Sequence, residues 1–243
     1  DMFGTGEDGD SLKFTSDEAG TTQLAHECVW YKDTNSGFYV KVNLDNDSQY
    51  TPIYVWYGYP DATGTESASN VWTNGVAIWH FEGNANDTIG SYNGTVYGAD
   101  RSTSYGKVNE GYYFNSTSDY ITHSTVSTSA PFTIMHWGKI TSYDSTYGHI
   151  AWGYSGASNF GTWIMASSGT TITTFNCRPS GSAYTSSNPS SSGNTATITN
   201  WNLFSYVQTN ATTATQQING NTEYTPTING GNLGALQFNA IGM

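Results

Sequence analysis

Short segments of alternating apolar and polar residues recur along the chain. In residues 38–44, FYVKVNL, every second position is apolar, and Lys41 and Asn43 lie between apolar positions. Because successive side chains of a strand point to opposite faces, this alternation predicts a β-strand with one buried face. Similar segments that end in Gly, Ser, Asn or Pro predict further strands within residues 52–60, 75–83, 111–124, 131–140, 149–156, 162–168 and 203–210.

The composition agrees with this pattern. The 243 residues are rich in Tyr, Trp, Ser, Thr, Asn and Gly but poor in the aliphatic and charged residues that favour helices. We find no ten-residue window with a convincing helical stripe. The fold class is therefore predicted to be all-β, with many short strands arranged as a sandwich or jelly roll.

Two polar stretches interrupt the strand pattern. Residues 61–75, DATGTESASNVWTNG, separate two strand-rich parts and predict a boundary near residue 73, with one domain in residues 1–73 and another in residues 74–243. The Ser- and Gly-rich residues 178–196 are predicted to form a long exposed loop.

Charge and cysteine usage narrow the classes of partner. The formal net charge is -12 with only seven Lys and Arg, which argues against nucleic acid and against an anionic membrane surface. No apolar run approaches the roughly 18 residues of a membrane span. Cys28 and Cys177 are far apart in sequence, and we expect buried thiols, with a disulfide as the alternative.

The first part of the chain carries two recognisable motifs. GDSLKFTSDEAGTTQLAHE, residues 9–27, and TPIYVWYGYPDATG, residues 51–64, resemble an uncharacterised domain of bacterial and archaeal surface proteins. Ser11, Lys13 and Tyr59 depart mildly from that family's pattern. The resemblance implies a β-sandwich-like domain that lacks its first strands in residues 1–73.

The second part is similar to the laminin-G-like, concanavalin-A-like lectin jelly roll. Four blocks in the family's order carry the resemblance: residues 77–99, 109–123, 132–140 and 201–221. The resemblance implies that IWHF, residues 78–81, is the first strand of this domain, with Ile78 and Trp79 on opposite faces. It also implies that the domain lacks its last strand, and the two families commonly occur side by side in this order.

Two aspartates fall on acidic positions of the lectin-like motifs. They are Asp87 in NANDTIG and Asp119 in STSDY, and both are candidate calcium ligands because calcium takes carboxylate and carbonyl oxygens. The alternative is a structural role without an ion, in which Asp87 makes an Asx-turn and Asp119 caps a bulge.

Aromatic and amide side chains suit carbohydrate recognition. Sugar rings stack on aromatic faces, and planar polar groups bond their hydroxyls. The candidate stacking residues in loops are Tyr92, Tyr147 and Tyr154, whereas most tryptophans occupy strand positions and are expected in the core.

Signs of catalysis are weak. The glutamates Glu27, Glu82, Glu110 and Glu223 are isolated in sequence, although glycoside hydrolysis needs two neighbouring carboxylates. The histidines lack metal-ligand spacing, and His80 and His136 are expected to pack beside Trp79 and Trp137. We therefore expect a protein that is not an enzyme.

Three functional hypotheses follow. The first is a non-catalytic, adhesive extracellular or virion-surface protein that recognises a glycan or surface polysaccharide. The second is a structural subunit or spacer of a surface filament, fibre or layer, which pairs with neighbouring copies through open sheet edges. The third is a glycoside hydrolase.

Overall fold

Strands dominate the computed structural model, which confirms the all-β class. The chain divides into two compact units, Asp1–Ser91 with Val108–Glu110, and Tyr92–Lys107 with Gly111–Met243. The predicted boundary near residue 73 stays a prediction; residues 74–91 belong to the first compact unit. The structure describes residues 12–32, 35–44, 50–57, 66–116, 118–141, 149–153, 161–166, 172–179, 183–187, 196–220 and 226–242.

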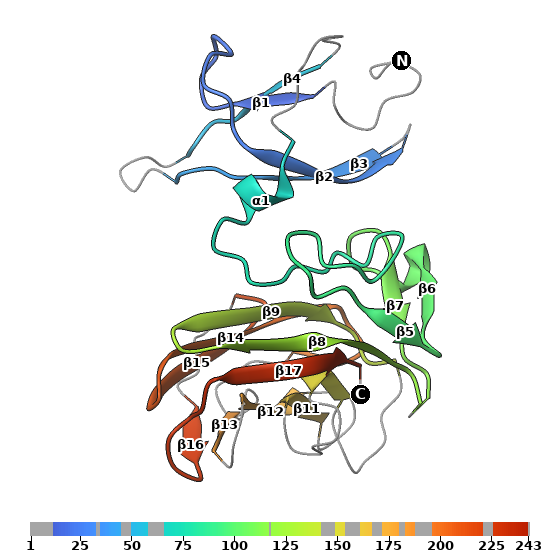
Figure 1. Cartoon of the computed structure of the whole chain (residues 1–243), viewed down its shortest axis with the longest axis vertical. Coiled ribbons are helices and arrows are strands. Elements are labelled where there is room, and N and C mark those ends of the chain that lie inside the picture. Colours follow the sequence, from blue (N-terminus) through green and yellow to red (C-terminus); the bar gives the residue numbers. More distant parts are fainter. Residues whose placement is uncertain are drawn as a thin grey trace. The chain divides into compact units, whose positions relative to one another are not determined.

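The first unit contains two small antiparallel sheets (Figure 1). One pairs β1 (Lys13–Thr15) with β4 (Tyr54–Trp56), and the other pairs β2 (His26–Lys32) with β3 (Asn35–Val40). The rings of Phe14, His26 and Phe38 pack together, with centroids 5.1 Å apart for Phe14–His26 and 5.6 Å for Phe14–Phe38. These contacts join the two sheets into one core.

A short helix and a loop follow these strands. Helix α1 (Ala68–Val71) begins after Ser67, whose side chain accepts a hydrogen bond from the Asn70 amide. The strand predicted in residues 75–83 is wrong, since Ile78 to Phe81 pair with no strand among the described residues. Ile78 instead bonds within its own loop: its amide donates to Asp87 Oδ1 at 2.9 Å, and its carbonyl accepts from the Thr88 amide at 2.8 Å.

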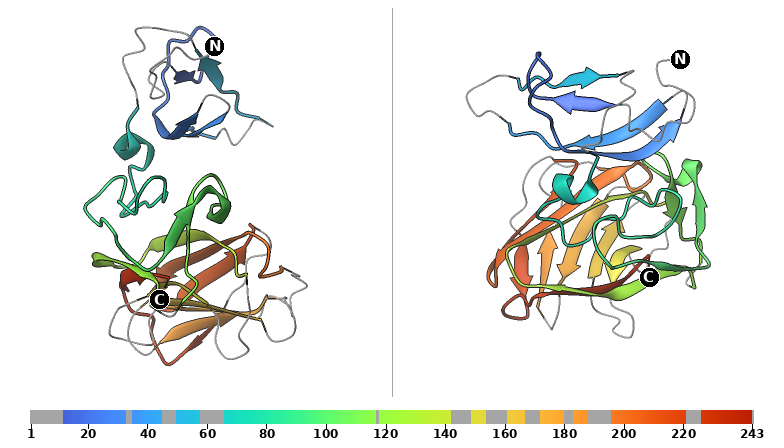
Figure 2. Two further views of the ribbon diagram at one scale, coloured as in Figure 1. Left: turned by 90° about the vertical axis from the view of Figure 1, so that its right-hand side faces the viewer. Right: turned by 45° about the horizontal axis from the view of Figure 1, so that its top comes forward.

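The second unit is built from antiparallel sheets of eight, three and two strands (Figures 1 and 2). The eight-stranded sheet has the order β16 (Thr227–Asn229), β13 (Tyr184–Ser187), β12 (Ile172–Arg178), β11 (Gly161–Ala166), β10 (His149–Gly153), β17 (Leu236–Ile241), β8 (Tyr120–Thr128) and β5 (Thr95–Tyr97). The three-stranded sheet has the order β15 (Thr213–Ile218), β14 (Asn202–Asn210) and β9 (Phe132–Gly138). The smallest pairs β6 (Asp100–Ser102) with β7 (Gly111–Tyr113), and a 3-10 turn, η1 (Thr103–Tyr105), lies between these two strands.

The two larger sheets share one core. Ile172 of β12 packs with Phe204 of β14 and Ile218 of β15, and each is at most 2 % exposed. A buried hydrogen bond of 3.2 Å also crosses between the sheets, from Gln216 Nε2 to Thr185 Oγ1. The inner faces of both sheets therefore pack against each other.

Most predicted strands are confirmed, with shorter or shifted ends. Burial alternates along β14, where Phe204 and Tyr206 are buried and the residues between them are half-exposed. The strand predicted in residues 111–124 is divided into β7 and β8. The division follows from a turn in which Asp119 Oδ2 accepts from the Asn115 amide at 2.9 Å.

The predicted exposed loop in residues 178–196 is wrong where β13 forms. Thr185 in this strand is 0 % exposed. Its hydroxyl donates to the Cys177 carbonyl at 3.1 Å and accepts from Gln216, so the polar side chain is buried with its hydrogen bonds satisfied. A polar composition therefore does not prevent a strand from entering this core.

Candidate functional site

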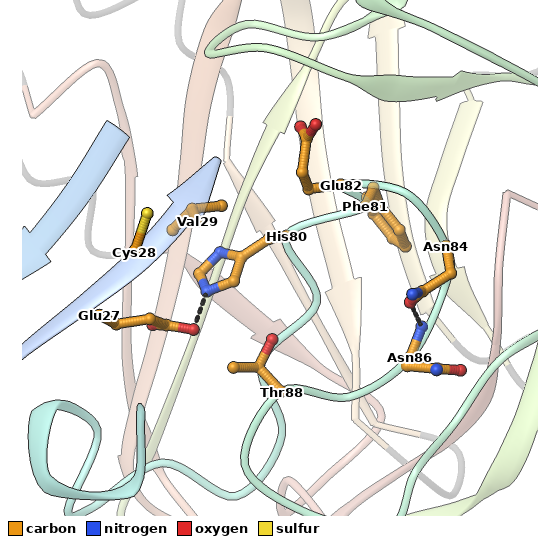
Figure 3. A pocket seen from close by; sticks show the side chains of 9 residues that line it. All are labelled: Glu27, Cys28, Val29, His80, Phe81, Glu82, Asn84, Asn86 and Thr88. Carbon is orange, nitrogen blue, oxygen red and sulfur yellow. Dashed lines mark hydrogen bonds and ion pairs between the residues drawn. The ribbon is translucent and has the colours of Figure 1, made fainter. Parts of the chain in front are cut away.

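A cleft in the first unit gathers polar side chains from β2 and from the loop after α1 (Figure 3). Its volume is about 260 Å³. The residues that line it are Glu27, Cys28, Val29, His80, Phe81, Glu82, Asn84, Asn86 and Thr88.

Glu27 is a nearly buried carboxylate in the lining of this cleft. It is only 5 % exposed, and its Oε2 accepts a hydrogen bond of 2.7 Å from Trp72 Nε1. Its Oε1 lies 3.1 Å from His80 Nε2, as the dashed line in Figure 3 marks. One buried carboxylate therefore joins β2 to the segment after α1 and to the following loop.

Aromatic rings enclose this carboxylate–imidazole pair. The ring of Tyr39 stacks on His80, with centroids 5.1 Å apart and planes at 17°. Trp72 meets Tyr39 edge-on at 5.1 Å. Burial raises the pKa of Tyr39, and the neighbouring Glu27 charge adds to this effect. His80, which was expected beside Trp79, thus lies in a cluster that sequence spacing does not indicate.

Glu82, the other carboxylate that lines the cleft, also bonds the chain itself. Glu82 accepts from Asn109 Nδ2 at 2.7 Å and from the Glu110 amide at 3.2 Å. Glu110 in turn accepts from the Gly83 amide at 2.9 Å. These side chains cross-link two loops of the first unit, a role that is structural.

Phe81 lines the cleft with an unusual backbone. Its φ is 62°, in the left-handed region that bulky residues rarely adopt. Such a conformation costs on the order of 1–3 kcal/mol and persists only where the surroundings impose it. The bonds around His80 and Glu82, on either side of Phe81, provide that constraint.

The two candidate calcium ligands lie in different units, and each supports a turn. Asp87 is 7 % exposed, and its Oδ1 accepts from the Ile78 amide at 2.9 Å and from the Ile89 amide at 3.3 Å. The bond to Ile89 is an Asx-turn. Asp119 is 5 % exposed and accepts from the Asn115 amide. Within the described ranges, no three His, Cys, Asp or Glu side chains gather in a way that could hold a metal. Calcium binding stays a prediction.

One of the three candidate stacking tyrosines falls within the described residues. It is Tyr92, which is half-buried in the second unit. Tyr147 and Tyr154 lie outside the described residues. The role of all three in glycan binding therefore stays a prediction.

A second candidate site is the outer face of the three-stranded sheet. Trp137 and Met135 of β9 point to this face and are 45 % and 59 % exposed. Met135 lies opposite Ser205 of β14, which lies opposite Gln217 of β15. By alternation, the outer face comprises Thr133, Met135, Trp137, Leu203, Ser205, Val207, Thr215 and Gln217.

Two lysines flank Trp137. Lys107 Nζ lies 5.4 Å from the centroid of the Trp137 ring, within the range of a cation–π contact. Lys139 is exposed two residues beyond Trp137, and the Ile140 amide still donates to the Ile198 carbonyl at 2.9 Å. The extended pairing thus continues past β9, so alternation puts Lys139 on the same side as Trp137.

Sequence reasoning missed this face. His136 was expected to pack beside Trp137. Its ring instead stacks on Phe204 at the inner face of the sheet, with centroids 5.2 Å apart. This expectation is wrong because adjacent residues of a strand point to opposite faces. A strict alternation along residues 131–140 puts Trp137 on the face opposite to His136, and this was the signal in the sequence that Trp137 is exposed.

The two cysteines lie in different units, and neither belongs to the outer face. Cys177 is buried in the second unit, and Cys28 is half-buried at the cleft of the first. Both are thiols.

Comparison with known proteins does not identify the chain. No protein-family model, no curated protein and no solved structure matches it. Within the described part of the chain, no helix has the length and apolar character needed to cross a membrane.

Proposed function

We propose that this chain is a non-catalytic recognition protein of an extracellular or virion surface, and that it binds carbohydrate. The second unit is then a concanavalin-A-like, laminin-G-like jelly roll and the first a β-sandwich-like surface domain. The two sheets that share a core are compatible with this finer arrangement.

The observation that supports carbohydrate binding is the exposure of Trp137 on a flat sheet face. An indole that is 45 % exposed offers a broad apolar surface for a sugar ring. Hydroxyl and carboxamide groups of Ser205, Thr215 and Gln217 on the same face suit sugar hydroxyls. Among the described residues of the second unit, Tyr97 is the other strongly exposed aromatic, and its ring stacks on Tyr120 at 4.8 Å.

A non-catalytic role fits the state of the carboxylates at the cleft. Glycoside hydrolysis needs one carboxyl group that protonates the leaving-group oxygen. It needs a second that attacks the sugar carbon or activates a water molecule. Glu27 and Glu82 each accept two hydrogen bonds from side chains or amides of the protein. These bonds orient both groups toward the chain, which favours a structural role over hydrolysis.

The test is a glycan array followed by titration calorimetry with the best ligand. We expect binding to at least one glycan class, and we expect Trp137→Ala to weaken it at least about tenfold, as for a central aromatic contact. Tyr97→Ala is the matched control, because Tyr97 is also 45 % exposed in the second unit. Silence across the array, or equal affinity of Trp137→Ala and the unmodified protein, contradicts the proposal.

Calcium belongs to this proposal as a candidate structural ion near Asp87 or Asp119. Its test is the melting temperature of the protein with calcium and with excess chelator, since a bound ion must shift stability. An unchanged midpoint refutes a structural ion and leaves the observed turn bonds as the role of both carboxylates.

A second candidate function is a subunit of a surface filament or layer. One observation favours it: β5 lies at an end of the eight-stranded sheet as described, and all three of its residues are exposed. An exposed edge strand can accept a strand from another copy. Concentration-dependent polymers in analytical ultracentrifugation, abolished by Val96→Lys, support this function, and a monomer at all concentrations refutes it.

A further inference from the structure

We propose that the outer face around Trp137 binds an acidic polysaccharide whose carboxylate sits on the stacked sugar ring, that is, a polyuronate. This inference rests on the proposed carbohydrate binding and adds the charge of the ligand. It follows from the distribution of charge around Trp137.

The sheet that carries Trp137 is depleted of acidic residues. The chain has 19 Asp and Glu but only seven Lys and Arg, yet β9, β14 and β15 contain no acidic residue. Of the seven cations, Lys107 lies over the Trp137 ring, and alternation puts Lys139 on the same side of the sheet. A positive flank beside an exposed indole complements an anionic ring ligand.

The position of Lys107 favours a carboxylate over a sulfate ester. Its ammonium group lies 5.4 Å from the Trp137 ring centroid, so a charge it contacts must lie close to the stacked sugar ring. The carboxylate of a uronic acid is attached directly to that ring, whereas a sulfate ester projects further on a hydroxyl oxygen. An exposed cation–π contact contributes only about 0.5–1 kcal/mol. Lys107 can therefore leave the indole at small cost and bind the carboxylate of the ligand instead.

The unit that carries the outer face has no net acidic charge of its own. The first unit has fifteen acidic and three basic residues, whereas the second has four of each. The whole net charge of -12 therefore belongs to the first unit. The second unit, which carries the outer face, is thus electrically balanced by itself, and its lysines near Trp137 face no excess of acidic residues within that unit.

The experiment compares polyuronates with their neutral esters. Oligomers of galacturonate, alginate and hyaluronate, too short to form gels, are titrated against the full chain, each beside its methyl-esterified form. We expect the best polyuronate to bind about tenfold more tightly than its ester. Added salt should lower the affinity for the polyuronate and leave the affinity for the ester unchanged.

Variants then separate the charge from the stacking. Lys107→Gln with Lys139→Gln should remove the polyuronate's advantage without changing affinity for the ester. Trp137→Ala should weaken both ligands. Arg101→Gln is the control, since Arg101 is an exposed cation of the same unit in β6.

The outcomes distinguish the two levels of the proposal. If Trp137→Ala leaves every affinity unchanged, carbohydrate binding at this face is wrong. If Trp137→Ala weakens binding but no polyuronate exceeds its ester, only the polyuronate inference is wrong. Tighter binding of dextran sulfate or of single-stranded poly(dT) than of any polyuronate also overturns the inference, in favour of sulfated or nucleic-acid ligands.

Discussion

Glu27 shows how one side chain can join segments that are distant in sequence. It bonds Trp72, 45 residues away, and His80, 53 residues away. Both partners reach a carboxylate that is almost fully buried. Such a group stabilises the fold only while its partners remain in place, because a buried polar group that loses its bonds is costly.

We expect Glu27→Ala to lower the free energy of unfolding by about 2–3 kcal/mol, since it removes two hydrogen bonds to a charged group. Urea titration followed by tryptophan fluorescence measures the change, with Trp72 as a nearby reporter. Glu18→Ala is the control, because Glu18 is exposed in the same unit and should change stability by less than about 0.5 kcal/mol. Equal effects of both variants would show that the bonds of Glu27 contribute nothing.

His136 provides a pH-dependent contribution to stability. Burial lowers its pKa from 6.5 to about 4, and its Nε2 has no hydrogen-bond partner among the described residues. The unfolded imidazole thus takes up a proton at a higher pH than the folded one. The contribution of neutral His136 to the free energy of unfolding is therefore fully present above about pH 6.5. It is lost as the pH drops toward 4, by up to about 3 kcal/mol.

We expect His136→Phe to reduce this acid sensitivity, because a phenyl ring can keep the stacking on Phe204 without titrating. The free energy of unfolding is measured for both proteins at pH 7 and at pH 4.5. The difference between the proteins should shift in favour of the variant at the lower pH. The same loss of stability in both would refute a buried neutral imidazole at this position.

At the scale of elements, the turn between β5 and β6 depends on a glycine. Gly98 has a φ of 69°, and a Cβ built there would clash with Asp119 Oδ1. The same carboxylate group accepts from the Asn115 amide before β8. The glycine therefore permits both the backbone conformation and the close approach of Asp119.

Gly220, which follows β15, is a matched comparison because its φ is 66° and no described atom lies within 4 Å of a Cβ added there. We expect Gly220→Ala to cost about 1 kcal/mol from the backbone alone. Gly98→Ala should cost about 2–4 kcal/mol because it also displaces Asp119. Thermal melting of both variants measures the difference, and equal costs would show that the Asp119 contact is easily relieved.

The sequence predicted some central strands of the second unit and missed others. The alternation in residues 131–140 and 203–210 predicted β9 and β14, and β14 pairs with the whole length of β9. By contrast, no strand was predicted for Leu236–Ile241, although β17 pairs with both β8 and β10. Its buried positions, such as Phe238, are spaced correctly, but Gly and Asn around them resemble a turn in isolation.

On the scale of the whole molecule, the two units differ in charge. The first carries the net charge of -12, while the second has equal numbers of acidic and basic residues. Like charges within one unit repel each other and destabilise its compact state. This repulsion acts over about 30 Å at 10 mM salt but only about 8 Å at physiological ionic strength.

We therefore expect added salt to stabilise the first unit selectively. Hydrogen exchange followed by mass spectrometry, at about 10 mM and about 150 mM sodium chloride, resolves peptides from each unit. Amides of β2 and β3 should exchange more slowly at the higher salt concentration, and those of β14 should change little. A uniform effect along the chain would contradict an electrostatic difference between the units.

The sequence by itself determined the all-β class, the positions of eight of the seventeen described strands and the charge that disfavours nucleic acid. These properties depend on composition and on neighbours two residues apart, which a sequence displays directly. Tertiary structure alone decided that Ile78 bonds within a loop, that Glu27 meets His80, and that Trp137 is exposed beside Lys107. These contacts join residues that are distant in sequence and become neighbours only when strands pair and loops close. Local patterns in the sequence do not indicate such contacts, because they report only on neighbouring residues.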